Sequence, residues 1–170
     1  MTGLSDGAST VAFALINSDR FAAAAMSSCC IEPWTVMTVV GPAYADRMRT
    51  LGYPPATAPD RSFWAPASIA QNAATIDTPL LMQLADDEYL MSLEAFTALR
   101  EHDKPVDMYV FPDEHHIKWQ PAHRLAIYER NLDWFGFWLA GRIDPDPDKR
   151  EQFAHWKALR ARRDRAHVKE

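Results

Sequence analysis

The sequence has little cysteine, no long apolar run and no excess of basic residues. Its two cysteines, Cys29 and Cys30, are adjacent in a chain of 170 residues, so they cannot link distant segments, and they lack the spacing of a zinc site. We interpret them as reduced, buried thiols. No apolar run approaches the roughly 20 residues that span a bilayer. The formal net charge of -5 disfavours a nucleic-acid partner, because such proteins usually carry a basic surface.

The remaining composition is ordinary, with 48% hydrophobic and 24% charged residues, as in a soluble globular protein. We therefore expect neither a membrane nor nucleic acid among its partners. We expect a cytoplasmic location, because the first residues lack the charged-then-apolar order of a secretory signal.

Short apolar runs alternate with helical patterns along the chain. The strand candidates are residues 21–28, 79–84 and 106–111. The helix candidates are residues 6–17, 44–51, 90–99 and 119–139. Apart from its one short helix, the proline-rich stretch 29–66 is expected to be irregular. Strands and helices in series predict an α/β fold with a parallel sheet flanked by helices, of which about three strands are visible.

Two further expectations concern the last third of the chain. In the helix at 119–139, apolar residues recur at steps of three and four, and we expect this stripe to face a core. Its members are Leu125, Tyr128, Leu132, Phe135 and Leu139. Residues 143–170 are expected to form a basic helical tail, separate from a catalytic domain at 1–142 and docked by a narrow apolar edge. That edge consists of Phe153, Trp156 and Leu159.

Three residues follow strand ends in the order typical of α/β-hydrolases. Ser5 lies in Gly3-Leu4-Ser5-Asp6-Gly7, the Gly-x-Ser-x-Gly pattern of a nucleophile elbow. Asp86 and His116 follow the apolar runs that end at residues 84 and 111. A serine hydroxyl needs an imidazole to take its proton, and the imidazole needs a carboxylate to orient it. The pattern predicts a triad of Ser5, Asp86 and His116.

Other interpretations of the same residues exist. Ser5 can cap a helix, and Asp86 and Asp87 can cap the helix that follows them. The neighbours His115 and His116 suggest a metal, but adjacent side chains diverge and no third ligand has a convincing spacing. We expect neither a metal nor a cofactor. The aromatic residues of 134–138 are more often core than ligand site.

At these residues the chain resembles the catalytic domain of the prolyl oligopeptidase family of serine peptidases. The resemblance runs from residue 3 to about residue 139. It is carried by GLSDG at 3–7, TPLLM at 78–82 leading to ADD at 85–87, PDEHH at 112–116 and YERNLDWF at 128–135. The resemblance implies that Ser5 is the nucleophile, Asp86 the orienting acid and His116, rather than His115, the general base. A peptide is the implied substrate.

The substrate pocket and the sub-family are also suggested by resemblance. Trp34 is similar to a pocket tryptophan of the family, but the aromatic residues that line the pocket of proline-cleaving members do not follow it here. We place Trp34, Met37 and Tyr89 in the pocket. The GLSDG motif, the run HIKWQP at 116–121 and the DPDP stretch at 144–147 resemble the lasso-peptide isopeptidase branch. Members of that branch are implied to hydrolyse the side-chain amide that closes the ring of a lasso peptide.

In the implied mechanism, the backbone N–H of Asp6 is one oxyanion donor, and a tyrosine on an upstream loop is the second. Family members are implied to carry a β-propeller and several strands before the elbow, so we expect this chain to be a C-terminal fragment. We then expect exposed apolar surface and an unpaired strand edge, and we expect the fragment alone to have no activity. The alternatives are an esterase or acylaminoacyl-type hydrolase on the same fold, and an inactive remnant.

Overall fold

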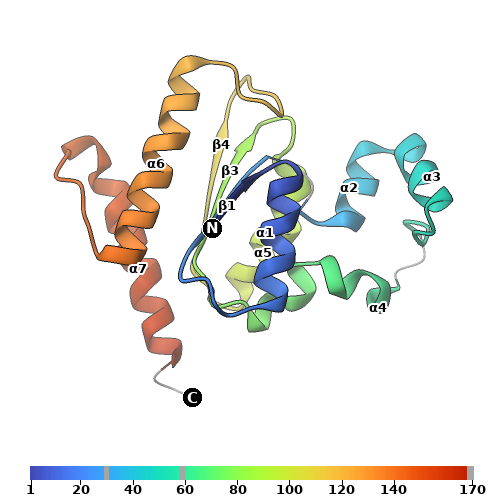
Figure 1. The fold of residues 1–170 in the computed structure, drawn as a ribbon, viewed down its shortest axis with the longest axis horizontal. Helices are drawn as coiled ribbons and strands as arrows, with labels where there is room; N and C mark the ends of the chain where they lie inside the picture. Colours follow the sequence, from blue (N-terminus) through green and yellow to red (C-terminus); the bar gives the residue numbers. More distant parts are fainter. Residues whose placement is uncertain (29–30, 58–59, 168–170) are drawn as a thin grey trace.

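Four parallel strands form a sheet in the part of the chain that the structure describes. The computed structural model describes residues 1–28, 31–57 and 60–167 (Figure 1), so Cys29 and Cys30 lie outside the described residues. The strands are β1 (Thr2–Leu4), β2 (Ala24–Ser27), β3 (Leu80–Ala85) and β4 (Val106–Phe111), in the order β1-β2-β3-β4. Every neighbouring pair is parallel. The predicted α/β fold is confirmed, with the elbow segment as a fourth strand.

Helices cover both faces of this sheet. In Figure 1, α1 (Asp6–Asn17) and α5 (Leu93–Glu101) lie on one face, and α6 (Pro121–Ala140) and α7 (Arg150–His167) lie on the other. Strand side chains alternate between the two faces. Met26 and Met82 enter the core with α1 and α5, whereas Ala25 and Leu81 enter the core with α6 and α7. Strands β2 and β3 therefore anchor both helical layers.

The stretch between β2 and β3 is more helical than its many prolines predicted. It contains α2 (Pro33–Val40), α3 (Pro42–Thr50), α4 (Arg61–Trp64), η1 (Ala65–Ala67) and η2 (Ala70–Thr75). Two prolines that suggested irregular structure stand at the first positions of α2 and α3. Proline is tolerated there because the first N–H groups of a helix have no intrahelical partner. Two further short helices are η3 (Tyr89–Ser92) and η4 (Pro147–Lys149).

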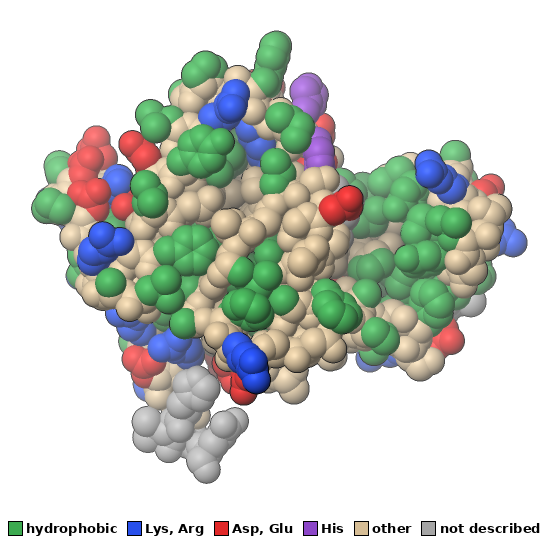
Figure 2. All heavy atoms as spheres, viewed as in Figure 1, with side chains coloured by type: hydrophobic (Ala, Val, Ile, Leu, Met, Phe, Trp, Pro, Cys, Tyr) green, Lys and Arg blue, Asp and Glu red, His purple; other side chains and the backbone are tan. Residues whose placement is uncertain are grey.

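The predicted buried stripe of α6 is wrong. Four of its members are between 58% and 71% exposed, namely Leu125, Tyr128, Leu132 and Leu139. The helix instead buries Ile127, Trp134, Gly136 and Phe137. The large aromatic rings on this face determine which side of α6 is buried. The indole N–H of Trp134 donates to the carbonyl of Ala24, 3.0 Å away. Figure 2 shows hydrophobic side chains at the surface over α6 and over the lobe of α2 and α3.

Helix α7 docks as its sequence pattern predicted. Phe153, Trp156 and Leu159 are buried against α6. The rings of Trp156 and Trp134 meet edge to face, with centroids 5.1 Å apart. The Trp156 indole N–H also donates to Asp107 of β4, 2.6 Å away, so α7 contacts both α6 and the sheet. Among the described residues, no helix is long and apolar enough to cross a membrane.

A buried carboxyl group joins α2 to the segment before β3. Glu32 is 2% exposed. The hydroxyl of Ser68 donates to one of its oxygens (2.6 Å), and the backbone N–H of Ala70 donates to the other (2.9 Å). Burial raises the pKa of Glu32 to about 7, and the hydrogen bond from Ser68 opposes part of this shift.

This raised pKa predicts a pH-dependent stability. Between the ordinary value of 4.5 and about 7, the folded chain binds the Glu32 proton more tightly than the unfolded chain does. The free energy of unfolding therefore falls as the pH rises through this window, by up to about 1.4 kcal/mol per pH unit from this group. Urea unfolding of the chain and of Glu32→Gln, which cannot titrate, measures the difference. Equal pH slopes for the two proteins would contradict the prediction.

Candidate active site

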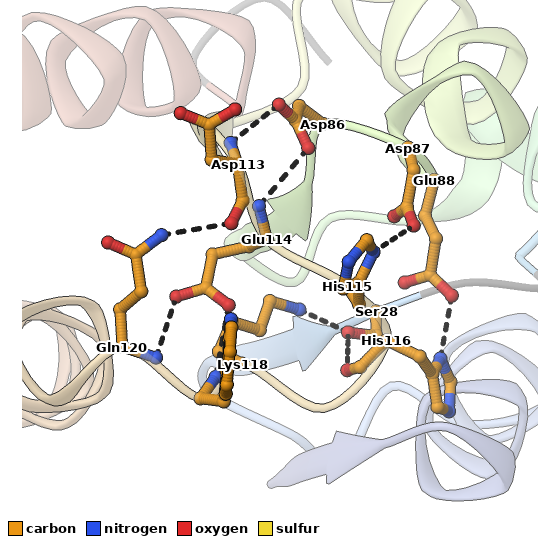
Figure 3. Close-up of polar contacts among 11 residues, drawn as sticks. Ser28, Asp86, Asp87, Glu88, Asp113, Glu114, His115, His116, Lys118 and Gln120 are labelled. Carbon is orange, nitrogen blue, oxygen red and sulfur yellow. Dashed lines mark hydrogen bonds and ion pairs between the residues drawn. The ribbon is translucent and has the colours of Figure 1, made fainter.

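The four strand ends bring the candidate site residues to one edge of the sheet. Because all strands are parallel, their carboxyl ends meet there. Ser5 follows β1 and Ser28 follows β2. The acidic turn at 86–88 follows β3, and the loop with the two histidines follows β4. Figure 3 shows that the side chains from these last two segments lie together, with Ser28 beside them.

Ser5 occupies a strained turn between β1 and α1. Its φ of 59° and ψ of -122° lie in a region that non-glycine residues rarely adopt. A Cβ atom on Gly3 would lie 2.1 Å from the carbonyl oxygen of Gly7, so the strand and the helix cross too closely for any side chain at residue 3. This crossing explains the first glycine of the pattern. Although Ser5 is the N-cap residue of α1, its side chain makes no capping hydrogen bond.

Two histidine–carboxylate pairs lie side by side at the β3 and β4 ends (Figure 3). Nδ1 of His116 is 2.7 Å from Oε1 of Glu88, and Nδ1 of His115 is 2.9 Å from Oδ2 of Asp87. The pairs differ in burial. The side chains are 36% and 11% exposed for His116 and Glu88, but 76% and 48% exposed for His115 and Asp87. Water screens the second pair more strongly, so the first is the better oriented.

The carboxylate against His116 is thus Glu88, and the expectation for Asp86 needs correction. The carboxylate of Asp86 accepts hydrogen bonds from the backbone N–H groups of Asp113 (2.7 Å) and Glu114 (3.3 Å). These bonds hold the pKa of Asp86 below its ordinary value, the bond from Asp113 most strongly. Asp86 therefore fixes the turn that starts the histidine loop, and Glu88, two residues further on, reaches the imidazole. No motif in the sequence distinguishes Glu88 from its acidic neighbours.

The far end of the histidine loop is fixed by a second carboxylate. Glu114 is fully buried and accepts from the backbone N–H groups of Trp119 (3.0 Å) and Gln120 (3.1 Å). Its Oε1 is also 2.9 Å from Nδ1 of His123. These contacts fix the end of the histidine loop just before α6 begins. Because Asp86 fixes its start, the loop that carries His116 is held at both ends.

The remaining predicted site residues have separate environments. Asp6 is the first residue of α1, with its side chain exposed. Trp34 lines a cavity of about 150 Å³ with Arg61 and Trp64, whereas Met37 is buried and Tyr89 packs against the core of α1 and α5. In the part of the chain that the structure describes, no group of three or more metal-ligating side chains is present.

Comparisons with known proteins show the family to which the chain belongs. Residues 1–142 match the prolyl oligopeptidase family. The lasso peptide isopeptidase AtxE2 of Asticcacaulis excentricus is 52% identical over 166 residues, which cover 98% of this chain and 24% of that protein. The structure of AtxE2 without a ligand superposes with a TM-score of 0.89 at 54% identity, covering 95% of this chain and 25% of AtxE2.

A more distant structure has the same fold. An acylaminoacyl peptidase of Pyrococcus horikoshii matches with a TM-score of 0.66 at 20% identity, over 88% of this chain and 25% of that enzyme. The chain spans about a quarter of the length of each of these relatives. The serine elbow, the histidine loop and the match over residues 1–142 lead to one conclusion: the chain belongs to the prolyl oligopeptidase family.

Proposed function

We propose that this chain carries the catalytic residues of a serine peptidase, with Ser5 as nucleophile, His116 as general base and Glu88 as orienting acid. The observation that carries the proposal is the 2.7 Å contact between His116 Nδ1 and Glu88 Oε1, at the sheet edge where the strained Ser5 turn lies. Membership of a peptidase family supports the same chemistry.

The proposed reaction proceeds through an acyl-enzyme. Glu88 accepts a hydrogen bond from the Nδ1–H group of His116, which leaves Nε2 unprotonated and able to take the hydroxyl proton of Ser5. The serine oxygen attacks the amide carbonyl, and the backbone N–H of Asp6 donates to the oxygen that becomes negative. His116 then gives its proton to the leaving nitrogen as the C–N bond breaks. Water attacks the resulting ester, and its proton returns through His116 to Ser5.

We further propose that the amide is the isopeptide bond that closes the ring of a lasso peptide. The support is the 52% identity to AtxE2, whose name describes it as a lasso peptide isopeptidase. A variant of AtxE2 with Astexin3-dC4 bound also superposes on this chain, with a TM-score of 0.87 over 95% of it. A triad attacks side-chain and main-chain amides by the same steps, so the surrounding protein must select the bond. The cytoplasmic location stays a prediction.

The first prediction separates Glu88 from its acidic neighbours. The substitution Glu88→Gln is made in a protein that contains this chain and has the length of the relatives. It should lower kcat by about 10³- to 10⁴-fold, because the amide no longer stabilises the imidazolium or holds the required tautomer of His116. Asp87→Asn is the matched control. Water screens its exposed pair with His115, so activity should stay within about fivefold of the parent.

The same series includes Asp86→Asn, read out as amide hydrolysis rate alongside a circular dichroism spectrum. We expect a smaller loss than for Glu88→Gln, because Asp86 holds backbone groups and not the imidazole. A larger loss in Asp86→Asn than in Glu88→Gln, at equal folded content, would return the role of the acid to Asp86.

A second prediction concerns the choice of base. His116→Ala should abolish hydrolysis, whereas His115→Ala should leave it largely intact, since the exposed imidazole of His115 is paired with Asp87. The hydrolysis rates of the two variants on one peptide substrate show which histidine is the general base. The reverse order would show that His115 is the base.

A third prediction tests the substrate. Incubation with an intact lasso peptide and with a linear peptide of the same sequence, followed by mass spectrometry, should show a gain of one water in the lasso peptide and opening of its ring. Cleavage of the linear peptide alone would contradict the isopeptidase proposal and favour an ordinary peptidase. Hydrolysis of an ester but of neither peptide would favour the esterase alternative.

A further inference from the structure

A buried lysine lies two residues after His116. Lys118 is 5% exposed, and its ammonium group donates a hydrogen bond to the hydroxyl of Ser28 (Figure 3). The same hydroxyl donates to the carbonyl oxygen of His116, 2.8 Å away. Ser28 itself is fully buried. The side chains of Lys118 and Ser28 thus form a two-bond relay that ends on the backbone of His116.

The chemistry of the three groups fixes the direction of this relay. An ammonium group has donors and no acceptor, so the Ser28 oxygen must accept from Lys118. The hydroxyl proton is then free to be donated, and the carbonyl of His116 receives it. A hydroxyl that accepts from a cation is a stronger donor, because successive hydrogen bonds polarise one another. The charge of Lys118 therefore strengthens the bond that holds His116.

Ser28 also connects the base to the nucleophile. It follows β2 with a φ of 64°, and its N–H donates to the carbonyl of Gln83 on β3 (3.3 Å). The preceding carbonyl, that of Ser27, accepts from the N–H of Ser5 (3.3 Å). Two successive residues at one strand end therefore hold the backbone of the Ser5 turn and the backbone of His116.

Burial of the ammonium group is costly. Desolvation lowers the pKa of Lys118, and the negative charges of Glu88, Glu114 and Asp87 offset only part of this effect. The loop does not need the lysine for its attachment alone, since Asp86 and Glu114 already hold its two ends. An apolar side chain would fill the same space at lower cost.

We propose that Lys118 and Ser28 are positioning residues, which hold the His116 imidazole against Glu88 during the reaction. The inference rests on the proposed role of His116 as base. Lys118 does not touch the reacting atoms in this scheme. It acts through Ser28, and loss of either residue should release the carbonyl of His116 and let the ring move away from the orientation that proton transfer requires.

The test uses Lys118→Met, Ser28→Gly and the double variant in a protein with the length of the relatives. Glycine removes the hydroxyl and suits the positive φ of residue 28. Lys104→Met is the matched control, because Lys104 precedes β4 at the opposite edge of the sheet, where it pairs with Asp77. Rates are divided by the concentration of active sites, obtained by fluorophosphonate titration, so that misfolded protein does not count.

We expect each single variant to lower kcat by about ten- to a hundredfold, as small displacements of a catalytic group do, with KM nearly unchanged. The double variant should be no slower than the slower single variant, since both break one relay. Lys104→Met should retain the parent kcat. Additive losses, or single variants with the parent kcat, would overturn the proposal.

A second readout does not depend on catalysis. In protein labelled with ¹⁵N-histidine, the Nδ1–H proton of His116 should give a low-field signal through its bond to Glu88, assigned by its loss in His116→Gln. The signal should weaken or move upfield in Lys118→Met and Ser28→Gly, and stay in Lys104→Met. An unchanged signal in both relay variants would overturn the relay. A changed signal in a protein that hydrolyses no amide would support the relay and refute the proposed function.

Discussion

The parallel alignment of the four strands is the constraint on which the site depends. Its register pairs Leu4 with Ser27, Ser27 with Gln83, and Ala85 with Phe111, so the strands end at one edge. A reversed strand would carry its following loop to the other edge and separate nucleophile, acid and base. The short strand β2 lies between β1 and β3, and its last carbonyl and the next hydroxyl reach the loops on both sides.

Much of this arrangement could be predicted from local pattern. The helix expected at 6–17 and the strand expected at 106–111 have those bounds in the structure, because the pattern of each segment ends where polar residues or a proline follow it. The positions of Ser5 and His116 follow from the same logic, since polar residues directly after buried strands must lie at the carboxyl edge. The sequence pattern therefore predicted the parallel sheet and two of the three residues that we propose as the triad.

The remaining features of the site depend on where individual side chains point in three dimensions, and the sequence pattern does not contain this information. Asp86, Asp87 and Glu88 are consecutive acids, and the path of the turn decides that the first meets a backbone and the last meets His116. Helix α6 is apolar on more than one face, and the fit of Trp134 under the sheet decides which face is buried. No sequence pattern marks Lys118 as buried, and only the structure places its side chain against Ser28.

The proposed function depends on activation of Ser5 by His116, and covalent labelling measures this activation. A fluorophosphonate probe is applied to a protein with the length of the relatives, and the modified residue is identified by peptide mass spectrometry. We expect one phosphonylated residue, Ser5, and no labelling after His116→Ala. Labelling of a different serine, or no labelling of the folded parent protein, would contradict it.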